Sequence, residues 1–182
     1  ELLFLRGEVP VGMAVDESIP SLSRTPLDYP LKYGYAVVGR ILKAGRDVDT
    51  NLEGRLVFAF HSHESCFVAP PDELVEIPAN MQPEKAVLLP TMETALSLVM
   101  DAQPIVGERI VVMGLGAVGL LVTHLLASML PGRLVGVDVV RIRRELATRY
   151  GAHAVVTGVE AVDAIQDELS RSPGGQEYQG AD

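Results

Sequence analysis

The sequence predicts two consecutive folding units, a β-rich unit followed by an α/β unit whose strands form a parallel sheet. Three observations support this fold class. Short apolar runs separated by turn residues fill residues 35–77, which is typical of a small antiparallel barrel or sandwich. Residues 83–102 contain no glycine and change to a helical repeat, and from residue 107 onward strand-like and helix-like runs alternate. We therefore place the border between residues 82 and 83.

The β-rich unit, residues 1–82, is expected to hold short strands joined by tight turns. Residues 1–30 are rich in proline and serine and indicate loops with short strands. The β-branched and aromatic runs that follow are bounded by glycine or proline and predict four further strands. These strands are expected at residues 35–42, 55–60, 66–69 and 74–77.

The α/β unit, residues 83–182, opens with a helical repeat over residues 83–102 that Pro90 should kink or break. The alternation that follows implies a doubly wound parallel sheet with helices on both faces. Strands are expected at residues 110–113, 134–137 and 154–156. Helices are expected at residues 117–130, 141–150 and 162–169, the second with Ile142, Leu146 and Tyr150 on one face.

The composition excludes several classes of protein. Hydrophobic residues make up 48% of the chain and charged residues 21%, which fits a packed globular protein and not a disordered one. The formal net charge of −9 repels phosphate backbones, so we expect no nucleic-acid partner. The single cysteine, Cys66, excludes an internal disulfide and a four-cysteine zinc site, and we expect it to be a small core residue of a cytoplasmic protein.

A glycine motif follows the strand expected at residues 110–113 and opens the next helix. The first glycine permits a tight turn, the second lets the main chain approach a diphosphate, and the third lets the helix pack close to the sheet. Asp138 ends the following strand about 20 residues further on, where its carboxylate can accept hydrogen bonds from an adenosine ribose. The complete pattern predicts a dinucleotide site at Gly114, Leu115, Gly116, Ala117, Val118, Gly119 and Asp138.

The same stretch allows a membrane span by hydropathy alone, because residues 110–130 lack a formal charge. Three glycines would weaken a spanning helix, however, and His124 would be costly inside a bilayer. A doubly covered parallel sheet explains the apolar run without further assumptions. We therefore expect no membrane partner.

Asp138 also bears on the choice of coenzyme, since a carboxylate there repels the 2′-phosphate of NADP and favours NAD. Three arginines, Arg141, Arg143 and Arg144, leave NADP open because one guanidinium can pair with that phosphate. The plainer interpretation places them on the solvated face of their helix.

Several stretches of the chain resemble, in family order, the medium-chain dehydrogenase/reductase family of the alcohol dehydrogenase superfamily. They are residues 34–41, 53–58 and 86–95, followed by the glycine motif with Asp138. Residues 1–7 and 29–35 further resemble the bacteriochlorophyllide dehydrogenase-like subgroup. The resemblance implies a GroES-like catalytic domain that lacks its start and a Rossmann domain that lacks its second half, so we expect a fragment that is inactive alone.

The resemblance also implies the activity, a hydride transfer between a nicotinamide coenzyme and a small secondary alcohol or carbonyl compound. By position, Thr94 resembles the threonine that packs near the nicotinamide, and Arg143 resembles a basic residue that contacts the adenosine ribose. The full-length protein is expected to form a homo-oligomer.

A catalytic zinc is doubtful on the same comparison, because Tyr35 stands where zinc-dependent members carry a histidine ligand, and Pro90 aligns near another ligand. Without zinc, His63 could serve as general base and Tyr35 could orient the substrate oxygen. Two alternatives stay open. One is a zinc-dependent alcohol or polyol dehydrogenase that uses His61, His63, Glu64 and Cys66, and the other is a non-catalytic relative that only binds a dinucleotide.

Overall fold

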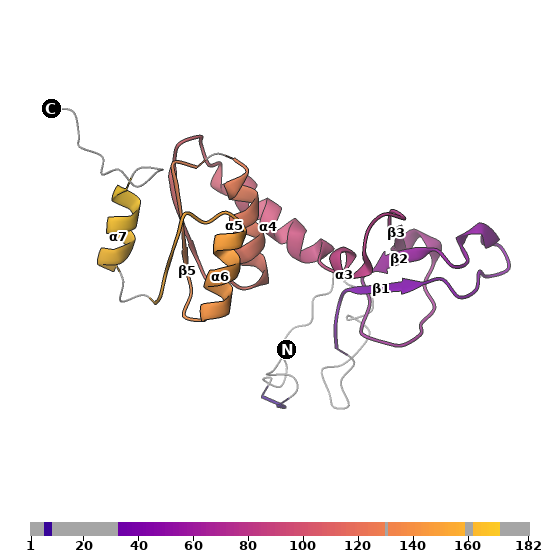
Figure 1. Ribbon diagram of the computed structural model, residues 1–182. Coiled ribbons are helices and arrows are strands. Elements are labelled where there is room, and N and C mark those ends of the chain that lie inside the picture. The colour runs from indigo at the N-terminus through magenta and orange to yellow at the C-terminus, as the bar shows by residue number, and fades with distance from the viewer. Residues whose placement is uncertain (1–5, 9–32, 130, 159–161, 172–182) are drawn as a thin grey trace. The chain divides into compact units, whose positions relative to one another are not determined.

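The computed structural model describes residues 6–8, 33–129, 131–158 and 162–171. The chain divides into two compact units, Glu1–Leu89 and Pro90–Asp182. Each holds one three-stranded sheet within the described residues, antiparallel in the first unit and parallel in the second (Figure 1).

The sheet of the first unit has the order β1-β2-β3, with β1 at Val37–Arg40, β2 at Leu56–Ala59 and β3 at Leu74–Glu76. Both pairs are antiparallel. Two short 3-10 helices, η1 at Thr50–Leu52 and η2 at Pro71–Glu73, lie in the connections. These strands match three of the four expected ones.

The strand expected at residues 66–69 is wrong, because that segment pairs with no strand of the described residues. Val68 is almost fully exposed, and the ring of Phe67 stacks on His61 instead of packing against a sheet. Pro70 and Pro71 follow directly and have no N–H to donate to a ladder.

The core of the first unit explains where the unit ends. Phe58, Ile77 and Ala86 form a buried cluster, and Ala86 belongs to the short helix α3 at Pro83–Ala86. Because α3 packs on this sheet, the first compact unit extends to Leu89, and the expected domain border between residues 82 and 83 stays a prediction.

The helical repeat expected over residues 83–102 is split into α3 and a longer helix, α4, at Leu89–Ala102. Pro90 lies in the first turn of α4, where a missing N–H costs no hydrogen bond. The expected break is therefore confirmed, but it lies at residues 87 and 88, just before Pro90, and the helix resumes at Leu89.

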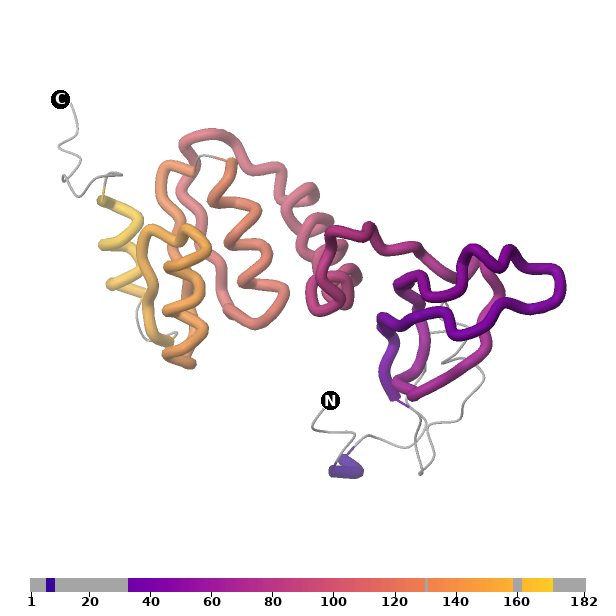
Figure 2. The backbone as a smooth tube through the Cα atoms, turned by 45° about the vertical axis from the view of Figure 1, so that its right-hand side comes forward, coloured from indigo at the N-terminus to yellow at the C-terminus, as the bar shows by residue number. Residues whose placement is uncertain are grey.

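The second unit alternates strands and helices, and its parallel sheet has the order β4-β5-β6. The strands are β4 at Arg109–Met113, β5 at Arg133–Val137 and β6 at Ala154–Val156. The helices are α5 at Ala117–Ala127, α6 at Arg141–Arg149 and α7 at Val162–Ser170. Along the chain these elements form strand-and-helix pairs, and the tube view follows the chain through them to the yellow helix α7 (Figure 2).

Helices cover both faces of this sheet, as the predicted doubly wound arrangement requires. On one face, Leu134 of β5 is buried in a cluster with Leu126 of α5 and Ala147 of α6. On the other face, Val135 and Val137 are buried beneath α7. Successive side chains of β5 thus enter opposite layers, and every residue of this strand is buried.

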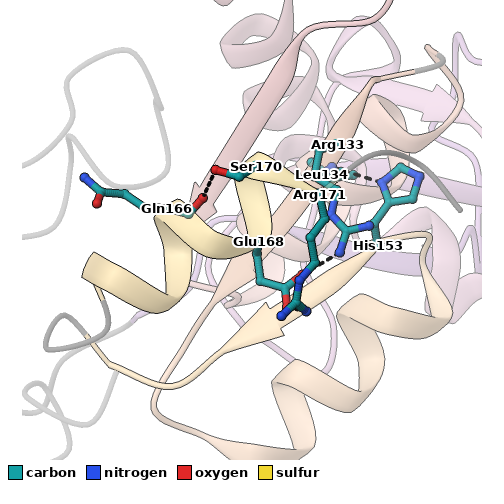
Figure 3. Close-up of polar contacts among 7 residues, drawn as sticks. All are labelled: Arg133, Leu134, His153, Gln166, Glu168, Ser170 and Arg171. Atoms are coloured by element: carbon teal, nitrogen blue, oxygen red, sulfur yellow. Dashed lines mark hydrogen bonds and ion pairs between the residues drawn. The ribbon is translucent and has the colours of Figure 1, made fainter. Parts of the chain in front are cut away.

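An ion pair fixes α7 to the sheet. Arg133, at the start of β5, pairs with Glu168 of α7, and both side chains are largely buried. Glu168 also binds Arg171 through its second oxygen at 2.6 Å, while His153 accepts a hydrogen bond from the main chain of Leu134 (Figure 3). His153 therefore helps to hold the segment before β6 against the start of β5.

The membrane interpretation of residues 110–130 is wrong, since most of this stretch forms β4, a turn and α5, which ends at Ala127. Among the described residues, no helix is both long enough and apolar enough to cross a bilayer.

Candidate functional site

The glycine turn leaves the carboxyl end of β4 and is held by the neighbouring strand. Gly114 has a φ of +87°, a conformation that side chains rarely adopt, and its N–H donates to the carbonyl of Val137 at 2.8 Å. The turn therefore starts at the edge where parallel α/β sheets bind their ligands.

Gly116 forms the N-terminal cap of α5, and no side chain of the described residues caps the helix. The first intrahelical bond runs from Leu120 to the carbonyl of Gly116, which leaves the amides of Ala117, Val118 and Gly119 without an intrahelical partner. A Cβ at Gly116 would meet no atom within 4 Å. Open space next to free N–H groups fits a diphosphate.

Gly119 meets a different requirement. A Cβ at this position would overlap the carbonyl of Gly114, so the helix can approach the turn only because residue 119 has no side chain. The three glycines thus serve the turn, the open approach and the close packing that their spacing predicted.

The side chain of Leu115 packs into the core and so holds the turn in place. Its side chain is fully buried in the core cluster of the unit. It covers Gly136 of β5, where a Cβ would lie only 3.2 Å from Leu115 Cδ1. The main chain of Leu115 is therefore held in place by packing as well as by hydrogen bonding.

Asp138 connects the turn to the end of β5. Its Oδ2 accepts a hydrogen bond from the N–H of Leu115 at 2.8 Å, and its Oδ1 accepts one from the N–H of Val140 at 2.7 Å. A guanidinium nitrogen of Arg143 lies 3.5 Å from Oδ2. The side chain is only 5% exposed, so this carboxylate is both buried and well supplied with donors.

These donors keep Asp138 ionised. The N–H of Val140 is the main cause that lowers the pKa of the Asp138 carboxyl below its usual value, and the Leu115 N–H and the Arg143 guanidinium act in the same direction. Burial opposes them without reversing the shift. The structure thus brings a carboxylate to the glycine turn, as the fingerprint requires, and its contact with a ribose stays a prediction.

The three arginines of the sequence pattern have different surroundings. Arg141 is exposed and pairs with Glu145 on the same helix, whereas Arg144 donates to the main-chain carbonyl of Asp138 at 2.7 Å. Only Arg143 faces the Asp138 carboxylate. The interpretation of all three as a solvated helix face is therefore wrong for Arg144, which is partly buried, whereas Arg141 and Arg143 are exposed.

Thr94 lies in α4, where its hydroxyl donates to the carbonyl of Pro90 at 3.0 Å. This bond within the helix is common for threonine and leaves the hydroxyl an acceptor. Its expected place near a nicotinamide stays a prediction.

Tyr35 and His63 lie in the first unit, where main-chain bonds continue the pairing of β1 with β2. The N–H of His61 donates to the carbonyl of Tyr35 at 3.1 Å, and the N–H of His63 donates to that of Tyr33 at 2.9 Å. The His63 ring lies against Gly34, whose φ is +103° and where a Cβ would overlap the imidazole. The two residues proposed for catalysis therefore share one end of the sheet.

The cluster His61, His63, Glu64 and Cys66 is not assembled as a metal site. The His61 ring stacks on Phe67 with 3.8 Å between ring centroids, and its Nδ1 lies 2.9 Å from the carbonyl of Ser62. Nowhere in the described part of the chain do three histidine, cysteine or acidic side chains come close enough to hold a metal ion. Cys66 is exposed, so its expected place in the core is wrong.

Comparison with known proteins gives no match to a family model but several related proteins. D-guloside 3-dehydrogenase of Escherichia coli K12 is 31% identical over 122 residues, which cover 65% of this chain and 35% of the relative. D-xylulose reductase A of Aspergillus oryzae is 28% identical over 107 residues, which cover 56% of this chain and 30% of the relative. The chain thus spans about a third of the length of the curated relatives it matches.

Solved structures add the architecture. Galactitol-1-phosphate dehydrogenase of Escherichia coli superposes with a TM-score of 0.61 and 16% identity, covering 85% of this chain and 55% of the other. The quinone oxidoreductase of Thermus thermophilus, which was also solved with NADPH, superposes with a TM-score of 0.57 and 23% identity. The match covers 74% of this chain and 43% of the other. The chain has the fold of these oxidoreductases. Its first unit is GroES-like and its second is a Rossmann unit, as the family resemblance implied.

Proposed function

We propose that this protein is an NAD(P)-dependent oxidoreductase that interconverts a secondary alcohol and a carbonyl compound. The observation that carries the proposal is the glycine turn, open at Gly116 and joined through the Leu115 N–H to the buried carboxylate of Asp138. Relatives that are named for acting on D-xylulose and on a D-guloside support a sugar or polyol as the substrate class.

The residues of the second unit would hold the coenzyme. The amides at the start of α5 would bind the diphosphate, and Asp138, ionised and with lone pairs left, would accept the ribose hydroxyls. The nicotinamide ring, when bound, takes up or gives the hydride. We also propose that Thr94 and Arg143 contribute to this site, the first at the nicotinamide end and the second at the adenosine end.

The first unit would supply the groups that act on the substrate oxygen. The imidazole of His63 can accept the hydroxyl proton in oxidation and return one in reduction. The phenol of Tyr35 can donate a hydrogen bond that orients the same oxygen. This assignment needs no metal, and residues 61–66 do not by themselves gather three ligands for a zinc ion in the described structure.

Residues 1–7 and 29–35 resemble the bacteriochlorophyllide dehydrogenase-like subgroup, and we propose that the substrate is related to the substrates of that subgroup. We also propose that the full-length protein is a homo-oligomer in the cytoplasm.

The proposal is tested by measuring NADH binding to the protein calorimetrically, together with the variant Gly116→Val. A valine at residue 116 fills the open side of the turn, so we expect NADH affinity to fall by more than about 100-fold, which corresponds to about 2.8 kcal/mol. The control is Gly39→Ala in the first unit, where an added Cβ also meets open space. The NADH affinity of this variant should equal that of the unchanged protein.

Equal NADH affinity in the Gly116→Val variant would contradict the role of the turn. Oxidation of sugar alcohols is then assayed with NAD, with Tyr35→Phe and His63→Ala as comparisons. Binding without any turnover, unaffected by these two substitutions, would favour the non-catalytic alternative.

A further inference from the structure

Four hydroxyl groups in the second unit donate to the carbonyl four residues earlier in the same helix, within the described part of the chain. They belong to Thr94, Thr123, Thr148 and Ser170. Thr94, Thr148 and Ser170 are exposed, whereas Thr123 of α5 is fully buried. Water can replace an exposed bond of this kind, but a buried hydroxyl depends on a partner inside the protein. The bond of Thr123 therefore differs from the others in its surroundings.

The acceptor of the Thr123 hydroxyl is the carbonyl of Gly119, the last glycine of the motif, at 2.8 Å. Gly119 lies so close to Gly114 that a Cβ would overlap the Gly114 carbonyl. The carbonyl of Gly119 also accepts the N–H of Thr123, as the bonding pattern of α5 requires. Two donors from one residue thus fix the direction of this carbonyl, and with it the planar peptide group that Gly119 shares with Leu120.

Two peptide groups connect the Thr123 hydroxyl to the open start of α5. The first, between Gly119 and Leu120, accepts the hydroxyl at its oxygen and donates through the Leu120 N–H to the carbonyl of Gly116 at 2.9 Å. The second joins that carbonyl to the N–H of Ala117, which has no intrahelical partner. The Thr123 hydroxyl therefore lies at one end of a chain of hydrogen-bonded dipoles, and the free N–H of Ala117 lies at the other.

The dipoles of this chain point in one direction, so each polarises the next. A donor at the oxygen of a peptide group makes its N–H a stronger donor, by roughly 10–30% per bond, and a low local dielectric strengthens the effect. Because Thr123 is fully buried, no solvent water screens the first bond of the chain. The N–H of Ala117 should therefore donate more strongly to an anion than the same N–H without the hydroxyl.

We propose that Thr123 is a positioning residue of the coenzyme site, whose hydroxyl orients and polarises the Ala117 N–H that binds the diphosphate. Thr123 acts through the main chain, since its own side chain is fully buried and out of reach of a coenzyme. This inference rests on the proposed function, because Ala117 provides one of the amides assigned there to the diphosphate. It extends the site by one helical turn beyond the glycine motif.

The test removes the hydroxyl with Thr123→Val, which keeps a β-branched side chain of similar size, and measures NADH affinity by calorimetry. We expect the NADH dissociation constant to rise about fivefold, because the bond from Ala117 to the diphosphate weakens. Thr123→Ala lacks the hydroxyl too and should show the same loss, whereas Thr123→Ser keeps it and should bind like the unchanged protein. The matched control is Thr148→Val, which removes the same kind of bond from an exposed face of α6 and should leave NADH affinity unchanged.

Two further measurements distinguish positioning from a merely structural role. ADP-ribose carries the diphosphate and should lose the same factor as NADH in Thr123→Val, whereas adenosine carries the ribose without phosphate and should bind equally well. A general distortion of the site would weaken all three ligands. In the coenzyme-free protein, the Leu120 amide proton resonance should move upfield in Thr123→Val, because its bond to Gly116 weakens.

The outcomes separate this inference from the proposed function. Equal NADH affinity of Thr123→Val and the unchanged protein would overturn the inference alone, and so would an equal loss for adenosine. Denaturant titration shows which variants fold, and failure of both Thr123→Val and Thr123→Ala to fold would show that the hydroxyl serves stability, which also overturns the inference. An unchanged protein that binds no NADH would overturn the proposed function, and the inference with it.

Discussion

At the scale of single residues, Asp138 joins three parts of the second unit: the glycine turn, the end of β5 and the start of α6. Its oxygens accept the N–H groups of Leu115 and Val140, and its carbonyl accepts Arg144. Its position about 20 residues beyond the motif was visible in the sequence. Its main-chain partners were not, because no side-chain pattern marks which N–H groups a carboxylate will meet.

Replacing Asp138 by asparagine should destabilise the protein even without a coenzyme. An amide has one acceptor oxygen and one NH₂ group, so one of the two N–H donors would face another donor. We expect the free energy of unfolding to fall by about 1–3 kcal/mol in denaturant titrations. The control is Asp101→Asn, an exposed site at the end of α4, which should leave the free energy of unfolding unchanged.

The Asp138→Asn variant should also change how the free energy of unfolding depends on pH in the acid range. The folded-state pKa of Asp138 lies below its unfolded value, about 3.9, so its contribution to stability is complete above that value. The contribution is lost as the pH falls through the lower, folded-state pKa. The unfolding free energy of Asp138→Asn should therefore decrease less between pH 5 and the acid limit than that of the unchanged protein, and parallel curves would contradict the assignment.

At the scale of elements, the sequence predicted regular structure best where burial and periodicity agree. The strand expected at residues 154–156 is found with the same bounds, whereas residues 66–69 have an apolar composition but no partner strand in the part of the chain that the structure describes. For α6 the expected apolar face is wrong in part, since Ile142 and Tyr150 are exposed and Ala147 is the buried residue. Here the helix lies close to Gly136, and a small side chain fits that space.

Gly34 shows how an element depends on a position that the sequence left without a role. Its φ of +103° and the imidazole of His63 against its Cα both exclude a side chain. Gly34→Ala should therefore lower the free energy of unfolding by at least about 1 kcal/mol, and it should displace the His63 ring.

Denaturant titration and the His63 proton resonances measure these two effects. Gly39→Ala in β1 is the control, because its Cβ meets open space and alanine suits a strand at least as well as glycine. Unchanged His63 proton resonances in Gly34→Ala would show that the position of the His63 ring does not depend on a glycine at residue 34.

At the scale of the whole molecule, each unit has its own core, and α7 is held to the second by an ion pair as well as by apolar contacts. Arg133 pairs with Glu168 beneath α7, and its Nε has no hydrogen-bond partner in the described residues (Figure 3). A buried guanidinium with so few partners depends strongly on its one carboxylate. This pairing links positions 35 residues apart, and no local pattern could predict it.

Glu168→Ala should cost about 3–5 kcal/mol of unfolding free energy, because it leaves the buried charge of Arg133 uncompensated. The control is Glu145→Ala, which breaks the exposed pair with Arg141 and should cost no more than about 0.5 kcal/mol. Thermal and denaturant unfolding compare the two variants, and equal losses would show that burial does not govern the strength of the Arg133 pair.

The position of β5 has a consequence for how the second unit opens. The strand is paired on both sides, by β4 and by β6, and lies beneath helices on both faces. Its amide hydrogens can exchange with solvent water only when a neighbouring strand or a covering helix has already separated. Local fluctuations at the glycine turn can therefore proceed while β5 stays closed, which keeps Asp138 at a fixed place at the end of that strand.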